Sequence, residues 1–161
     1  MKFIFEITYV NKEFLVKAPY AALDGNLTID INHWLFFNEE VISLLELAIH
    51  ISSWLKEIEA GIYTDFDYSA DDYQENPVLH FYNLDNKHYI ISSAWVDSVT
   101  EIRLEVAEIV QCFNTFLQEL DGTIQQEYGV AFADIPLLKL LKAATKPKSS
   151  FLKDLLLHFL P

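Results

Sequence analysis

Apolar residues change their spacing along this chain, and that change decides the fold class. In residues 3–9 they alternate with polar residues, which is typical of a strand with one buried face. In residues 39–60 and 104–120 they recur at every third or fourth position, which is typical of an amphipathic helix. The order of strands, helix, strands and helices predicts an α+β fold, in which two long helices pack on one face of a largely antiparallel sheet.

Two hairpins and one or two further strands make up the predicted sheet. The first hairpin joins residues 3–9 to residues 14–18 through a turn at 11–12, and in this register Glu6 faces Lys17. A turn is also predicted at residues 24–26, with further strands at 27–31, extendable to 36, and at 64–68.

The second predicted hairpin joins residues 78–84 to residues 87–95 through a two-residue turn at 85–86. This register sets apolar side chains opposite one another across the two strands, which stabilises the pair. Because side chains alternate between the faces of a strand, it also places His80 and His88 on opposite faces of the sheet.

Helix boundaries follow from capping signals. The first long helix is predicted to begin after Asn38, because a capping side chain followed by two glutamates is typical of a helix start. It is expected to end at Gly61. The second begins near residue 104, or only from Glu105 if the preceding residues extend the sheet, and reaches about residue 128.

We interpret residues 1–161 as one domain, because this length is close to that of a single domain. Residues 135–161 are predicted to form two short helices, 135–144 and 149–160. Their net charge is +4, against −17 for residues 1–134. We expect this basic tail to pack on the acidic body, and the alternative is a self-associating structural protein with the tail as its homodimer contact.

The whole chain is acidic, with 24 Asp and Glu against 11 Lys and Arg, a net charge of −13 and a pI of about 4.6. Such a surface repels phosphate backbones, so nucleic-acid binding is not expected. The longest run without a charged residue, 109–118, is half of the roughly 20 residues that span a bilayer. With a single cysteine and no secretory signal, the chain is predicted to be cytoplasmic and to lack a transmembrane segment.

No catalytic residue, metal site or cofactor is predicted, so an enzyme is less expected than a binding protein. A calcium loop beginning at Asp65 fails, because Ala70 stands where glycine is needed and Asn76 where a bidentate glutamate is needed. The histidines lack the spacing of a zinc motif. Cys112 is expected to be a small buried side chain within a helix.

Residues 57–86 form the most distinctive segment, because they contain eight acidic residues and no Lys or Arg. Tyrosines interleaved with these acids provide rigid contact surface with a polar tip. Carboxylates around them suit a partner rich in lysine and arginine, so we expect a basic protein. The predicted contact residues are Asp65, Asp67, Tyr68, Asp71, Asp72 and Tyr73. The alternative is a solvated acidic loop whose aromatic side chains turn inward to the core.

A second hypothesis is a small-molecule-binding domain or enzyme with a pocket between the sheet and the helices. Its candidate lining residues are His80, Tyr82, Tyr89 and Trp95. A concave pocket holding a titratable residue with a perturbed pKa would favour this hypothesis, and a filled interface between sheet and helices would count against it.

The middle of the chain, residues 27–120, carries a pattern of short segments: Glu39-Glu40, Trp54-Leu55, Asp65–Ser69, Glu75–Phe81 and Ile90–Trp95. This pattern resembles small uncharacterised bacterial α+β proteins, some of which look like immunity partners of secreted toxins. The resemblance implies a bacterial, non-enzymatic, protein-binding role of unknown detail. It assigns no catalytic residue and does not extend to the basic tail.

Overall fold

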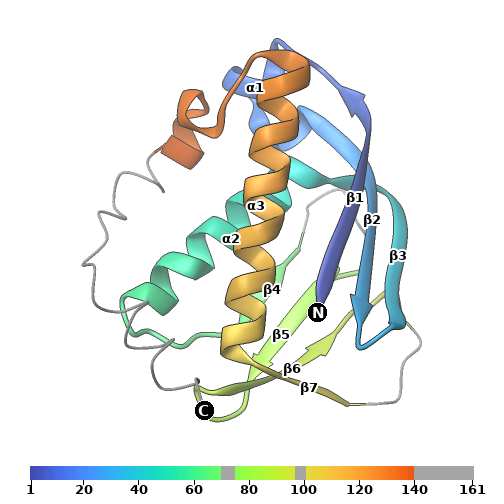
Figure 1. Cartoon of the computed structure of the whole chain (residues 1–161), viewed down its shortest axis with the longest axis vertical. Helices are drawn as coiled ribbons and strands as arrows, with labels where there is room; N and C mark the ends of the chain where they lie inside the picture. Colours follow the sequence, from blue (N-terminus) through green and yellow to red (C-terminus); the bar gives the residue numbers. More distant parts are fainter. Residues whose placement is uncertain (70–74, 97–100, 140–161) are drawn as a thin grey trace.

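The computed structural model describes residues 1–69, 75–96 and 101–139, which form two antiparallel sheets and two long helices (Figure 1). The first sheet has the order β1-β2-β3, with strands at Lys2–Val10, Leu23–Ile31 and Trp34–Ser43. The second has the order β4-β5-β6-β7, with strands at Phe66–Tyr68, Leu79–Asn83, His88–Ser92 and Ile102–Glu105. The expected α+β fold is confirmed, with the strands divided between two sheets rather than joined in one.

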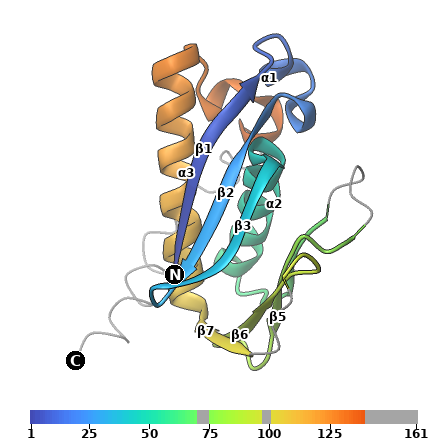
Figure 2. The same ribbon diagram turned by 90° about the vertical axis from the view of Figure 1, so that its right-hand side faces the viewer.

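Two long helices pack against both sheets. Helix α2 (Leu44–Glu59) contacts β2 and β4, and helix α3 (Val106–Tyr128) contacts β1 and β7. Both lie behind the first sheet in the view of Figure 2. The remaining elements are short: α1 (Phe14–Lys17) and the 3₁₀ turns η1 (Pro19–Ala21) and η2 (Phe132–Asp134).

The centre of the core is the ring of Phe113 on α3, which is fully buried. Its centroid lies 5.6 Å from Phe3 of β1 and 5.5 Å from Trp54 of α2. It lies 5.1 Å from Phe66 of β4 and 5.4 Å from Phe81 of β5. Tilted and edge-to-face contacts at such distances are favourable for aromatic rings. One side chain therefore holds both sheets and the other long helix together.

The predicted first hairpin is wrong, because residues 14–17 form helix α1 rather than a strand. Backbone N–H groups of Phe14 and Leu15 donate to the Asn11 carbonyl, which starts the helical turn. Leu15 is buried, while Phe14 and Val16 are exposed, the reverse of the expected faces. Strand β1 pairs instead with β2, which includes the predicted turn at 24–26.

A hairpin that the sequence analysis did not predict joins β2 to β3 through Asn32 and His33. Both residues have positive φ angles, 53° and 65°, and Ile31 pairs with Trp34 across them. Two residues in the left-handed region form the type of tight turn whose twist matches that of the flanking strands. The expected extension of one strand to residue 36 is therefore a second, antiparallel strand.

Helix α2 begins at Leu44, five residues later than expected, because residues 39–43 remain in β3. The pairing of β3 with β2 is irregular between Gly25 and Leu27, where two residues of β3 stand against one of β2. Val41 lies in this bulge with φ at 62°, a conformation that is strained for a β-branched residue. The end of α2 before Gly61 agrees with the prediction.

The second hairpin is confirmed as β5–β6, but its register differs from the prediction by one residue. The turn is one residue longer than expected, because Leu84 donates its backbone N–H to His88. Asn86 takes a positive φ, and its backbone N–H donates to the side chain of Asn83. A one-residue slip moves one strand's side chains to the other face relative to its partner. His80 and His88 therefore share one face.

The second long helix begins late, as in the alternative prediction in which the residues before it extend the sheet. Residues 102–105 form β7, and α3 begins at Val106 with a reciprocal capping box between Glu105 and Glu108. It ends at Gly129, whose φ is 72°. Of the predicted tail helices, residues 136–139 are helical, and the rest of both lies outside the described residues.

Gly25 allows three elements to meet closely, so we expect Gly25→Ala to destabilise the fold. A Cβ there would lie 2.3 Å from the backbone oxygen of Glu6 and 2.5 Å from a methyl group of Leu44. Relief requires a backbone shift, and we expect a loss of about 3 kcal/mol in the free energy of unfolding, measured by urea denaturation. Gly122→Ala is the matched control, because a Cβ there meets nothing within 4 Å. Equal stabilities of the two variants would contradict the close approach.

Val41→Gly should stabilise the fold, because glycine adopts positive φ without strain. Val41 is 61% exposed, so little buried surface is lost. The expected gain is about 1 kcal/mol in the free energy of unfolding. Val41→Ala provides the control, since alanine keeps a Cβ and should gain much less. A decrease on Val41→Gly would show that the left-handed conformation is not strained.

Candidate functional site

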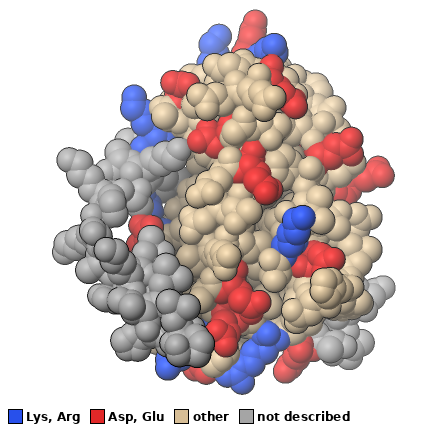
Figure 3. Space-filling model, viewed as in Figure 1, with Lys and Arg blue, Asp and Glu red and all other residues tan. Residues whose placement is uncertain are grey.

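Acidic side chains dominate the surface, as the composition requires. Figure 3 shows them spread over the face that carries α3 and the edge of β1, with basic side chains also present on this face. Carboxylates alone therefore do not distinguish a functional surface, and the side chains that lie beside them have to be considered. On the outer face of the second sheet, two exposed aromatic or apolar side chains, Tyr82 and Leu84, lie among carboxylates; others are exposed on the first sheet and around α1.

Alternation along β5 and β6 creates this outer face. Phe81, Tyr89 and Ile91 are buried against the helices. The residues between them point the other way, where Tyr82 is 51% exposed and pairs with Ile90 across the strands. The outer face therefore carries an apolar and aromatic centre.

Asp67, His80 and Tyr82 form one connected group on this outer face. Asp67 of β4 stands opposite His80 of β5, and its Oδ1 lies 2.5 Å from the His80 Nδ1. The His80 ring stacks on Tyr82 with centroids 6.3 Å apart. The Asp67 side chain remains 58% exposed, so a partner can approach this carboxylate. Asp65, just before β4, accepts the backbone N–H of Asn83 at 2.7 Å and is also exposed.

Asp85 organises the far end of the same face. Its carboxylate contacts the His88 Nδ1 at 3.0 Å and the Arg103 Nη2 at 3.2 Å. The hydrogen bond from the His88 side chain lowers the pKa of Asp85, and the backbone N–H groups of His88 and Lys87 lower it further. Asp85 therefore stays ionised, with Leu84 exposed beside it.

The predicted contact residues divide between surface, core and undescribed segments. Asp65 and Asp67 are exposed as expected. Tyr68 is not available to a partner, because its side chain is fully buried and its hydroxyl donates to the Ser43 carbonyl at 3.4 Å. The remaining three predicted contacts, Asp71, Asp72 and Tyr73, lie outside the described residues.

The four residues predicted to line a pocket do not surround one space. His80 and Tyr82 are on the outer face, whereas Tyr89 is fully buried and donates its hydroxyl to Thr64 at 3.2 Å. Burial, with Asp65 and Tyr63 nearby, raises the pKa of Tyr89 to about 12. Trp95 stacks on Phe37 and donates its indole N–H to the Glu75 carbonyl.

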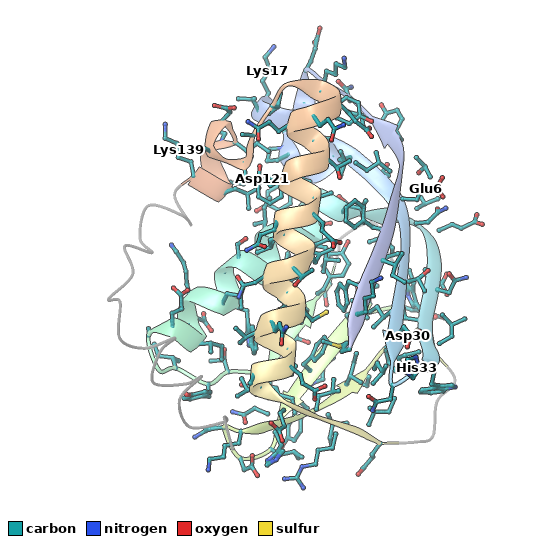
Figure 4. All side chains as sticks on the ribbon, viewed as in Figure 1. Glu6, Lys17, Asp30, His33, Asp121 and Lys139 are labelled. Carbon is teal, nitrogen blue, oxygen red and sulfur yellow. The ribbon has the colours of Figure 1, made fainter. Side chains whose placement is uncertain are left out.

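A cavity of about 250 Å³ lies elsewhere, between α2, α3 and the segment after α3. Its walls include Lys56, Glu59 and Asp121, and burial raises the pKa of Glu59. Asp121 also accepts the backbone N–H of Phe132 at 2.6 Å, and Figure 4 shows it on the side of α3 that faces η2. This volume is below the range of about 300–1,000 Å³ that is usual for ligand pockets.

Sequence reasoning missed Leu84, Asp85, His88 and Arg103 as parts of the candidate site. Arg103 reaches Asp85 only because β7 pairs with β6, and the alternation within either strand does not reveal that pairing. His88 was noted, but the predicted register placed it on the face opposite His80. The alternation of buried and exposed side chains along β5 and β6 was the available signal for this face. It identifies which residues share the face only when the register between the two strands is known.

The described part of the chain offers neither a cluster of metal-binding side chains nor a membrane-spanning helix. Residues 1–69, 75–96 and 101–139 contain no group of three or more His, Cys, Asp or Glu side chains placed to hold a metal ion. Among the helices of the same residues, none has the length and apolar character needed to cross a membrane.

A family model described as "Domain of unknown function (DUF7878)" matches residues 3–126. This range includes both sheets, α2 and nearly all of α3. No curated protein and no solved structure matches the chain. The outer face of the second sheet thus lies inside the matched range.

Cys112 should react slowly with thiol reagents in the folded chain. Burial raises the pKa of this thiol to about 11, from an ordinary value of 9.0. At pH 8 the thiolate population is then lowered about 100-fold relative to an unperturbed thiol. Absorbance of Ellman's reagent with the native and the urea-unfolded chain measures this difference. Equal rates would show that the thiol is accessible and would reopen a nucleophilic role.

Proposed function

The chain belongs to the DUF7878 family, and we propose that it is a non-enzymatic protein-binding domain that uses the outer face of its second sheet. We define the binding face as Asp65, Asp67, His80, Tyr82, Leu84 and Asp85. The observation that carries the proposal is the exposed Tyr82, held by stacking on His80 beside the carboxylate of Asp67.

The chemistry of the binding face matches the usual anatomy of a protein interface. Exposed Tyr82 and Leu84 provide an aromatic and apolar centre, and carboxylates surround them. Aromatic residues are enriched where interfaces bury their centre, and polar groups form the rim. An open sheet face suits a protein surface better than a small molecule, which usually binds in a concave pocket.

The charge of the binding face favours a basic partner. Within the described residues, the ion pairs of this face join Asp67 to His80 and Asp85 to His88 and Arg103. No Lys or Arg of these residues forms an ion pair with Asp65 or Asp67, so their carboxylates are available to a partner's cations. Electrostatic complementarity of this kind increases the association rate and selects the partner.

We propose that the domain acts as an immunity- or inhibitor-like protein, which covers the surface of a basic partner. Steric and electrostatic blocking needs no catalytic group on this chain. If the partner is an enzyme, a stoichiometric amount of this protein should abolish its activity.

Tyr82→Ala and Asp67→Lys should each weaken partner binding tenfold or more, because both change the middle of the binding face. The partner is first captured from host lysate and secretome at low and physiological salt, and its affinity is then measured by titration calorimetry. Tyr20→Ala and Glu40→Lys are the matched controls, since Tyr20 is 47% exposed and Glu40 is exposed on the first sheet.

Two results would reject this binding face. The first is that the control substitutions reduce the affinity for the captured partner as much as the substitutions in the binding face do. The second is retention of the partner that does not fall between low and physiological salt, because exposed charge pairs are screened by salt.

A further inference from the structure

We infer that the free edge of β1 is a strand-addition site for an extended, basic segment of a partner protein. β1 stands at the end of the order β1-β2-β3, so within the described residues one of its edges has no neighbouring strand. An extended peptide can add to such an edge through main-chain hydrogen bonds. The inference is independent of the binding face on the second sheet.

The backbone of β1 presents hydrogen-bonding groups to this edge. Alternate residues of an antiparallel strand direct their amides toward the neighbouring strand and away from it. The Glu6 carbonyl points toward β2, because a Cβ on Gly25 would lie 2.3 Å from it. Phe3 has the opposite phase, because residues at odd separation along an antiparallel strand direct their amides to opposite edges. Phe5 and Ile7 share the phase of Phe3, so their N–H and C=O groups point into the open edge.

A groove of about 770 Å³ runs beside these groups, between Lys2–Ile7 and α3. Figure 2 shows α3 beyond β1, on the side away from β2, so the helix forms a floor beneath the position of an added strand. Six residues of edge correspond to about 20 Å of extended chain. The α3 residues that line the groove are Gln118, Glu119, Gly122, Thr123, Gln126 and Glu127.

The floor of the groove selects basic side chains. The charged residues that line it are Glu6, Glu119 and Glu127 against the single base Lys2. The groove is therefore acidic on balance, and both charged residues that α3 contributes are glutamates. Side chains of an added strand alternate between the floor and solvent. A segment with Lys or Arg at every second position would therefore direct its cations toward Glu119 and Glu127.

Gly122 keeps the groove open. Glycine within a helix costs about 1 kcal/mol relative to alanine. A Cβ at Gly122 would meet nothing within 4 Å, so packing inside this chain does not require glycine. Gly122 lines the groove, so its missing side chain leaves space there for an added strand.

A second copy of this chain does not fit the same edge. In a two-fold dimer joined through β1, each α3 would extend beyond its own edge into the space beneath the other sheet. Both helices would then have to share the space beneath the joined edges, where packed helix axes need a separation of 8–10 Å. A single peptide segment lacks such a helix, so it is the occupant that the groove admits.

The test uses the full chain and a fluorescein-labelled eight-residue peptide in which lysine and threonine alternate. Its affinity for the chain is measured by fluorescence anisotropy. N-methylation of two adjacent central amides should lower this affinity at least tenfold, because it removes a hydrogen-bond donor from each edge of the extended peptide without changing its charge. A peptide of alternating glutamate and threonine should not bind. Hydrogen exchange of the Phe5 and Ile7 amides should slow when the lysine peptide is added.

Variants of the floor locate the site. Gly122→Gln should weaken peptide binding at least tenfold while raising the melting temperature, so the loss cannot come from unfolding. Glu119→Gln with Glu127→Gln should weaken it severalfold, and Glu101→Gln, exposed away from the groove, should not. Tyr82→Ala should leave it unchanged, which separates this site from the binding face.

Two results would overturn the inference. If the N-methylated peptide binds within twofold of the parent, the attraction is only that of cations to an acidic protein. If Gly122→Gln binds the peptide as tightly as the unchanged chain, or the Phe5 and Ile7 amides exchange at unchanged rates, the peptide does not occupy the edge of β1.

Discussion

Packing around Phe113 is the constraint on which the arrangement of the two sheets depends. Its ring touches Phe3 of the first sheet, Phe66 and Phe81 of the second, and Trp54 of the other long helix, at centroid distances of 5.1–5.6 Å. Aromatic contacts of this kind are directional as well as favourable. Because the four neighbours come from β1, β4, β5 and α2, one buried ring sets the angle between the sheets. The same packing therefore fixes how the outer face of the second sheet is oriented relative to the open edge of the first sheet.

The spacing of apolar residues and the capping signals predicted the fold class, the body of both long helices and the second hairpin. These features could be predicted because they depend on local sequence. The first hairpin could not be predicted in the same way. The alternation of Phe14 and Val16 suits a strand, but tertiary packing buries Leu15 and leaves both neighbours exposed. The start of α2 was placed early because Asn38 resembles a cap, whereas pairing with β2 keeps residues up to Ser43 extended. In each case a contact between distant segments overrode the local preference.

Among the residues predicted for the candidate site, Asp65 and Asp67 are exposed in the structure, whereas the predicted register of the second hairpin is wrong by one residue. Asp67 and Tyr82 were assigned to two different hypotheses, and the pairing of β4, β5 and β6 brings both to one face. Tyr68 was grouped with Asp67, but neighbouring residues of a strand point to opposite faces, so it is buried. The longer turn at Asn86 moved His88 to the side of His80. Such a turn is specified by side-chain hydrogen bonds to the backbone, and apolar spacing carries no record of them.

The order of strands within each sheet has a consequence for how the chain reaches this structure. Both sheets are meanders whose neighbouring strands are consecutive in sequence, so almost all strand pairing is local. Local pairings close short loops and are formed quickly, whereas contacts between distant segments are slow. The contact of Phe3 with Phe113 joins β1 to α3, which are far apart in the sequence. We therefore expect the two meanders to assemble separately, and their docking through this contact to limit the rate of folding.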